Sequence, residues 1–337
     1  GLSPTHAFEA CSFGRSDTLP GTRVPEPPPA TESAADQPAR PAQHPGSRPT
    51  VDAMGTLTEL IDVLAGHRLV VLTGAGVSTD SGIPDYRGPD SPPRNPMTYQ
   101  QFVGDPRFRR HYWARNQVGW RHVHRTEPNA GHRALVDLER RGIVNGVITQ
   151  NVDLLHRQAG SQTVIDLHGS YDRVVCLRCG TRYTRQQVAD RLDQLNPGFV
   201  ESVTEVADVE IAPDADAVVQ QTEHFVVADC WAPDPEGGPG PCGGILKPDI
   251  VYFGETVPRE RVERAFALVD EADAMLVAGS SLAVQSGLRF VRHAAAADKP
   301  IAVVNRGETR GDRYAAVTLH AGTSETLAEL ARRLPMP

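Results

Sequence analysis

Four apolar runs, each followed by small or polar residues, constrain this chain more than any other feature. The runs "RLVVLTGAG", "IVNGVITQNVD", "ADAMLVAGSS" and "KPIAVVNRG" are continuously apolar, which is typical of strands buried on both faces of a parallel sheet. A fifth run, "TVIDLHGS", predicts another strand, and helical stretches such as "NAGHRALVDLERRG" lie between them. Strands that alternate with helices predict an α/β fold with a doubly wound, Rossmann-like parallel sheet.

The ends of these strands predict the position of a binding site. Residues 74–76, 150–153, 279–281 and 305–307 are rich in glycine, serine, asparagine and glutamine. Ligands of open α/β sheets bind at the carboxyl ends of the strands. We therefore expect these four segments to frame one crevice.

The first segment reads as an apolar strand, a Gly-x-Gly and then a helix start rich in serine and threonine, from Gly76 onward. It departs from the fingerprint of hydride-transferring dinucleotide enzymes. Thr79 stands where the pattern G-x-G-x-x-G requires its third glycine. No acidic residue ends a second strand about twenty residues later, and the chain runs instead into "GPDSPPRNP", which cannot be a strand. These residues disfavour a dehydrogenase and leave open whether the loop holds a nucleotide.

Composition divides the chain into parts. Residues 1–53 are rich in proline and alanine with few large apolar residues, which predicts a disordered tail. Residues 54–170 and 246–337 are predicted to form the Rossmann-like domain, with a helical insertion at about 97–128. Residues 171–245 are predicted to form a small inserted zinc-ribbon and helical lobe.

Four of the five cysteines fall in the predicted small lobe. Cys176 and Cys179 form a C-x-x-C pair that can reach one tetrahedral ion, although a redox pair or two buried thiols have the same spacing. Cys230 and Cys242 supply a second pair, separated by eleven residues rich in proline and glycine that can loop out. All four together predict one structural zinc ion, whose closed coordination leaves the chemistry to the crevice.

Charge and hydropathy limit the class of protein. The formal net charge of −8 disfavours direct nucleic-acid binding, which usually shows a basic surface. No stretch approaches the length of a membrane span, and the first residues lack the apolar core of a signal peptide. We expect a cytoplasmic enzyme, monomeric, with no membrane partner.

His168 is the candidate general base of the crevice. It ends an apolar run at the border of the two predicted domains, where pockets form. A lone histidine is also often structural. Asn151 and Asp153 can bind a carboxamide or a ribose, or they can cap the helix that begins in "TQNVDLLH".

Seven motifs together resemble one family. "GAGVSTDSGIPDYRG", "TQNVDLLH", "LHGS", "CLRCG", "LKPDIVYFGE", "AGSSL" and "VVNRG" occur in the order and spacing of the sirtuins, the NAD-dependent protein lysine deacylases. The resemblance covers about residues 55–335. The stretches "YWARNQVGW" and "NPGF" resemble the class II branch.

The resemblance implies a reaction that consumes NAD. The acyl-lysine carbonyl oxygen attacks the nicotinamide ribose, nicotinamide leaves, and His168 acts as general base on the ribose hydroxyls. The acyl group passes to ADP-ribose, so acyl-lysine proteins are the expected substrates. Protein mono-ADP-ribosyl transfer and the removal of long-chain or lipoyl groups are the alternatives at the same site. A non-enzymatic zinc-ribbon module is disfavoured by the acidic balance and by His168.

The resemblance also implies roles for individual residues. Expected NAD contacts are Gly74, Ala75, Gly76, Ser78, Ile83, Asp85, Tyr86, Arg87, Gln150, Asn151, Asp153, Gly279, Ser280, Ser281, Asn305, Arg306 and Gly307. The strand expected to pair with a peptide substrate contributes Val251, Phe253, Gly254 and Glu255.

Overall fold

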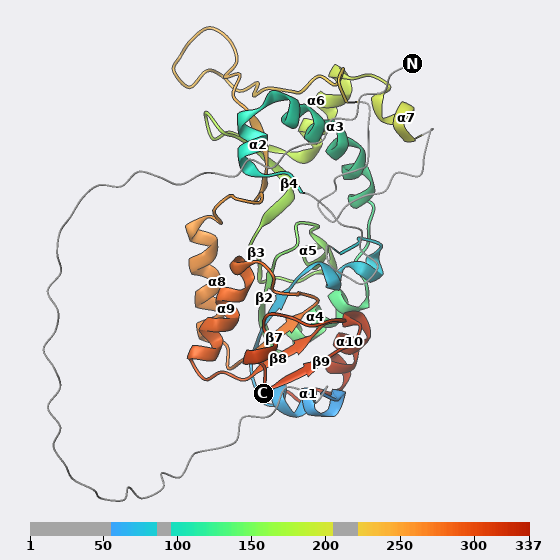
Figure 1. Ribbon diagram of the computed structural model, residues 1–337, viewed down its shortest axis with the longest axis vertical. Coiled ribbons are helices and arrows are strands. Elements are labelled where there is room, and N and C mark those ends of the chain that lie inside the picture. Colours follow the sequence, from blue (N-terminus) through green and yellow to red (C-terminus); the bar gives the residue numbers. More distant parts are fainter. Residues whose placement is uncertain (1–54, 86–95, 205–221) are drawn as a thin grey trace, which may run out of the picture. The chain divides into compact units, whose positions relative to one another are not determined.

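A six-stranded parallel sheet forms the centre of the larger part of the computed structural model (Figure 1), which describes residues 55–85, 96–204 and 222–337. The strand order is β3-β2-β1-β7-β8-β9. Their bounds are Leu69–Thr73 for β1, Val144–Thr149 for β2, Val164–Asp166 for β3, Ala274–Ala278 for β7, Ile301–Val304 for β8 and Val317–Leu319 for β9. The predicted α/β fold with a parallel sheet is confirmed.

Each strand sends alternate side chains to opposite faces of the sheet, and helices cover both faces. Val71 and Leu276 pack in one apolar cluster, while their neighbours Val70 and Val277 pack in another. The first face is covered by α1 (Leu57–Leu64), α4 (Ala130–Arg140) and α10 (Thr323–Arg333). The second face is covered by α8 (Arg259–Glu271) and α9 (Gln285–Ala296), as Figure 1 shows. Burial on both faces explains why the strands read as continuous apolar runs.

A smaller lobe surrounds a three-stranded antiparallel sheet in the order β5-β4-β6. Its strands are β4 (Gly169–Cys176), β5 (Arg182–Thr184) and β6 (Leu246–Ile250). Its helices are α2 (Tyr99–Gly104), α3 (Pro106–Val123), α6 (Arg185–Leu195) and α7 (Phe199–Thr204). Trp113 of α3 and Val174 of β4 lie in one apolar cluster with Cys176. The residues predicted as a helical insertion therefore pack on the cysteine-bearing lobe.

The lobe begins directly at His168, and the joint requires a glycine. Gly169 has φ +86°, and a Cβ atom added there would lie 1.8 Å from the carbonyl oxygen of Asp249. Only glycine tolerates both this conformation and this close approach. The joint therefore holds β4 against β6 immediately beside the candidate base.

Several helices begin at side-chain caps. Thr56, Thr98 and Thr184 each form a reciprocal capping box with the third helical residue, and Asn129 does so with His132. Each cap satisfies backbone N–H groups that the first turn leaves unpaired. The remaining short elements are α5 (Leu155–Ala159) and the 3₁₀ turn η3 (Asp312–Tyr314).

One local prediction is wrong. The segment after the first glycine-rich tip is not a helix start but two 3₁₀ turns, η1 (Ala75–Val77) and η2 (Thr79–Ser81). Gly82 ends the second turn with φ +86°, and Ile83-Pro84 follows, so no regular helix continues. The predicted tail 1–53 lies outside the described residues. No helix among the described ranges has the length and apolar character needed to cross a bilayer.

Candidate active site

A cavity of about 660 Å³ lies where the large sheet meets the smaller lobe. It collects predicted residues from all four strand tips and from the segment after β6. The predicted residues that line it are Gly74, Ala75, Gly76, Ser78, Ile83, Asp85, Gln150, Asn151, Asp153, His168, Val251, Phe253, Gly254, Glu255, Gly279, Ser280, Ser281, Asn305, Arg306 and Gly307. Tyr86 and Arg87 lie outside the described residues.

The glycines of two tips are pressed against each other. The N–H of Gly76 donates to the carbonyl oxygen of Gly279 at 2.9 Å. A Cβ atom added at Gly74 would lie 2.8 Å from that same oxygen, and one added at Gly76 would lie 2.9 Å from the Cα of Gly279. Gly279 itself has φ +64°. These contacts exclude side chains, so the cavity floor between the two tips is bare backbone.

Three polar side chains join the first tip to the tip of β2. The hydroxyl of Ser78 donates to Asp153 at 2.7 Å. The amide of Asn151 donates to the carbonyl oxygen of Gly74 and to Ser78 Oγ, both at 3.1 Å. Asp153 is 4% exposed, and burial raises the pKa of its carboxyl. Its other oxygen accepts the N–H of Leu155, the first residue of α5, although the N-cap position itself is Leu154. Asp153 therefore both lines the cavity and satisfies a backbone N–H of the first turn of α5.

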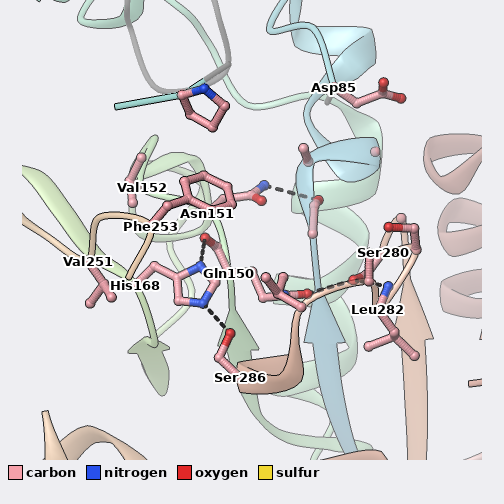
Figure 2. Close-up of a pocket in the computed structure, with 18 of the residues that line it drawn as sticks. Asp85, Gln150, Asn151, Val152, His168, Val251, Phe253, Ser280, Leu282 and Ser286 are labelled. Atoms are coloured by element: carbon pink, nitrogen blue, oxygen red, sulfur yellow. Dashed lines mark hydrogen bonds between the residues drawn. The ribbon is translucent and has the colours of Figure 1, made fainter. Parts of the chain in front are cut away.

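His168 is held at both ring nitrogens (Figure 2). Nδ1 lies 2.9 Å from the carbonyl oxygen of Gln150, and Nε2 lies 2.8 Å from Ser286 Oγ. Burial lowers the pKa of His168 to about 4, opposed by the bond to Gln150 and assisted by the positive charges of Arg261 and Arg289. The imidazole is therefore neutral near pH 7, with one lone pair able to accept a proton.

Ser286 was missed by the sequence predictions. It is the second residue of α9, five positions after the tip that ends at Ser281, and it also lines the cavity. The sequence offers no signal for it, because nothing in "VQSGL" marks which face of the helix meets His168.

The segment after β6 forms a second wall, but not as the predicted strand. β6 ends at Ile250, and Val251 follows with its N–H bonded to the carbonyl oxygen of His168 at 2.7 Å. Phe253 is 40% exposed at the cavity wall, and its carbonyl oxygen accepts the N–H of Tyr99 at 2.9 Å. The four predicted substrate residues therefore lie in a loop anchored at both ends.

The buried side chain of Lys247 supports the loop from Val251 to Glu255. Its ammonium donates to the carbonyl oxygens of Ile250 at 2.6 Å and Pro248 at 3.2 Å, and it pairs with Glu255 at 3.1 Å. Glu255 in turn accepts the N–H of Tyr252 at 2.9 Å. Burial lowers the pKa of Lys247, opposed by the charge of Glu255. The buried Lys247 ammonium therefore links the end of β6, through the carbonyl oxygens of Pro248 and Ile250, to Glu255 at the other end of the loop.

The four predicted cysteines come together in the smaller lobe. The sulfur atoms of Cys176, Cys179, Cys230 and Cys242 all lie within 4.8 Å of one another. The long spacing between the last two is accommodated because the chain between them folds out: Cys242 N–H bonds Ala232, and Gly243 N–H bonds Cys230. Four thiolates at these distances fit a tetrahedral zinc ion.

Comparisons with known proteins agree with this arrangement. The sequence profile described as the Sir2 family matches residues 74–286. An NAD-dependent protein deacetylase of Mycobacterium avium is 61% identical over 83% of this chain and 96% of its own length. A protein of the same name from Streptomyces coelicolor is 48% identical over 82% of this chain and 90% of its own length.

Solved structures give the same result. A mutant Sir2 homologue in complex with ADP-ribose is 30% identical, with a TM-score of 0.61, and the match covers 81% of this chain and 94% of that one. A Sir2 structure with a p53 peptide and NAD⁺ is 31% identical, with a TM-score of 0.55, covering 83% and 97%. The profile match, the identities and the shared fold together show that this chain belongs to the Sir2 family.

Proposed function

We propose that this protein is an NAD-dependent protein deacetylase that transfers the acetyl group of a modified lysine to ADP-ribose and releases nicotinamide. One observation carries the proposal: a neutral histidine, fixed at both nitrogens, faces a cavity with bare glycine backbone. The names of the relatives support the same activity. They do not favour mono-ADP-ribosyl transfer as the main reaction.

The residues of the crevice divide the binding of NAD among them. The backbone of Gly74 to Gly76 and of Gly279 suits the diphosphate, because no side chain blocks the approach. Asn151 and Asp153 suit the nicotinamide carboxamide and its ribose, since they offer an amide and a carboxylate at one wall. Asn305 to Gly307, which follow β8 and also line the cavity, suit the adenosine.

NAD supplies an electrophilic ribose carbon and a leaving nicotinamide. The loop from Val251 to Glu255 holds the peptide so that the acyl-lysine enters beside Phe253 and His168. His168 Nε2 would then accept a proton from a ribose hydroxyl, so that this oxygen attacks the acetyl carbon. The lysine amine leaves, the original acyl oxygen stays on the ribose carbon as its hydroxyl, and a water molecule supplies the carbonyl oxygen of O-acetyl-ADP-ribose. A general base of this kind contributes roughly 10²–10⁴ in rate.

The cysteine cluster suits a structural zinc ion. All four ligand positions are filled by protein sulfurs, so no position is left for water or substrate. The ion would hold β4, the turn after it and the 230–244 segment together. The predicted domain boundaries and the class II branch remain predictions, and acetyl is the default acyl group while longer neutral acyl groups stay possible.

A single assay tests the activity. Purified protein is incubated with NAD and one peptide sequence that carries acetyl-, butyryl-, lipoyl- or succinyl-lysine. Nicotinamide release and O-acyl-ADP-ribose are measured together. Transfer of ADP-ribose from labelled NAD to protein is measured separately. Stoichiometric O-acetyl-ADP-ribose supports deacetylation, whereas labelled protein without free deacetylated peptide supports ADP-ribosyl transfer instead.

A further inference from the structure

The ring nitrogen assigned as the base already has a protein partner. Ser286 Oγ lies 2.8 Å from His168 Nε2, and Figure 2 shows the serine directed at the ring from the first turn of α9. A base whose lone pair is occupied can accept a proton from substrate only after its partner moves. The contact therefore needs an explanation beyond packing.

The partners of the ring define which nitrogen carries hydrogen. The carbonyl oxygen of Gln150 can only accept, so the Nδ1 of His168 at 2.9 Å must be the N–H donor. In the neutral ring Nε2 is then the acceptor, and Ser286 must donate its hydroxyl hydrogen to it. The two contacts thus select the tautomer that has its lone pair on the cavity side.

Both partners stand on rigid elements. Gln150 follows β2 directly, and its N–H bonds the carbonyl oxygen of Thr73 at the end of β1 at 2.9 Å. Ser286 lies on α9, whose Leu288 is fully buried. The two elements also touch, since a Cβ atom added at Gly287 would lie 2.8 Å from Gln150 Nε2. The imidazole is clamped between a strand end and a helix start.

We propose that Ser286 is a positioning residue that fixes His168 in its base-competent tautomer and occupies the Nε2 lone pair until a ribose hydroxyl of NAD replaces it. This inference rests on the proposed function. Ser286 keeps its own proton throughout: its hydroxyl rotates away, and the proton that reaches Nε2 comes from the ribose hydroxyl. The bond from Ser286 also favours the neutral ring over the protonated one.

The proposed reaction has two stages that separate this role from a general structural one. Release of nicotinamide needs only the acyl oxygen and NAD, whereas transfer of the acetyl group needs the base. Ser286→Ala should therefore leave acetyl-peptide-dependent exchange of labelled nicotinamide into NAD within about twofold. Deacetylation should fall about tenfold, the value of one lost hydrogen bond to a reacting group.

The pH profile supplies a second readout. Loss of the Ser286 donor raises the pKa of His168, so the acid limb of kcat/KM for deacetylation should move to higher pH. The charged groups around the ring are Arg261 of α8, Arg289 of α9 and Asp249 of β6, which pairs with Arg261 at 2.6 Å. The substitution leaves all three charges in place.

Two further variants complete the experiment. Ser286→Thr retains the hydroxyl and should restore most of the deacetylation rate and the acid limb. Ser324→Ala is the control, because Ser324 is also the second residue of its helix, α10, although it is buried where Ser286 is half-buried. It should change neither stage.

The outcomes separate cleanly. Selective loss of deacetylation with an upward shift of the acid limb supports the proposal. Equal loss of both stages in Ser286→Ala, or no loss in either, overturns it. A wild-type protein that releases no nicotinamide with any acyl peptide overturns the proposed function itself. The wild-type assay therefore comes before the variants, so that failure of the proposed function is distinguished from failure of the role of Ser286.

Discussion

The cysteine cluster and the crevice are two polar sites of opposite design. In the cluster, the sulfur atoms of four cysteines lie within 4.8 Å of one another, an arrangement that suits one tetrahedral metal ion. In the crevice, side chains of different kinds, among them Ser78, Asp153 and His168, have hydrogen-bond partners and line a cavity of about 660 Å³. The first site can only hold the fold together, whereas the second keeps a reactive lone pair near open space. The comparison predicts that damage to each site has a different signature.

The largest effect is expected from breaking the cluster. Cys176→Ser removes a ligand, and because binding free energy at a structural site is folding free energy, the smaller lobe should lose its metal and unfold. β4 begins at Gly169, directly beside His168, so catalysis should be lost as well. Zinc content by mass spectrometry and thermal melting check this.

Cys11→Ser is the control for the cluster, because Cys11 is the fifth cysteine and lies outside the described residues. It should leave zinc content, melting and activity unchanged. A folded Cys176→Ser protein with full zinc content would show that the four sulfurs do not form the site.

Breaking the crevice should have the opposite signature. His168→Ala should fold, bind zinc and bind NAD, but lose deacetylation by roughly two to four orders of magnitude, the contribution of a general base. Calorimetric titration with NAD and rates with an acetyl peptide measure the two properties separately. A variant with more than half of the wild-type rate contradicts the role of His168.

The two sites also differ in how far the sequence predicts them. The spacing of Cys176 and Cys179 is compatible with a metal ligand pair, and the second pair, Cys230 and Cys242, makes a zinc site the favoured interpretation. The sequence predicts that Gly74 and Gly279 follow the ends of strands. It does not predict that the two glycines contact each other, because this contact depends on the tertiary structure. The hydrogen bond from Ser286 to His168 joins residues 118 positions apart and leaves no local pattern.

The prediction of a helix after Gly76 is wrong for a related reason, because tertiary contacts determine the structure of this segment. Serine and threonine favour helix starts, yet here they occupy two 3₁₀ turns that end at Gly82. Ser78 is committed to Asp153, and Thr79 bonds the carbonyl oxygen of Gly76. Polar contacts within the crevice outweighed local propensity, as is common at functional sites.

A third substitution sharpens the comparison because it lies where the two sites join. Lys247 belongs to β6 of the smaller lobe and supports the loop of the crevice. Lys247→Met leaves the Glu255 carboxylate without its cation partner, which is costly in a buried setting. KM for an acetyl peptide should rise about tenfold or more, while KM for NAD changes by less than about threefold.

Lys299→Met is the matched control for this variant. Lys299 is the only other lysine, and its ammonium also binds backbone carbonyl oxygens, those of Val269, Asp270 and Ala272. It should lower the melting temperature without changing either KM. Equal effects of both variants on KM for the peptide would remove the special role of Lys247.

The smallest effect concerns the free energy of unfolding in acid and the buried side chain of His132. His132 is fully buried, and burial lowers its pKa to about 4, assisted by the charge of Arg133. The unfolded state therefore binds more protons between pH 6.5 and pH 4, so the stability that neutral His132 contributes is present above pH 6.5 and is lost as the pH falls toward 4. At pH 5 this loss amounts to about 2 kcal/mol.

His132→Gln isolates that contribution. Glutamine at the third helical position can still accept the N–H of Asn129, as His132 Nδ1 does at 3.3 Å, so the capping box of α4 is retained while the titration is removed. Urea unfolding at pH 7 and pH 5 should show a difference between the two pH values that is about 2 kcal/mol smaller in the variant than in the wild type. Comparison at each pH cancels any acid effect on the cysteine cluster, and His320→Gln, which removes an exposed histidine, controls for the loss of a ring as such. An unchanged pH dependence in His132→Gln would mean that His132 does not govern the acid sensitivity. That role would then pass to His156, whose ring contacts that of His132 at a tilt of 60° with centroids 4.8 Å apart and whose pKa burial also lowers.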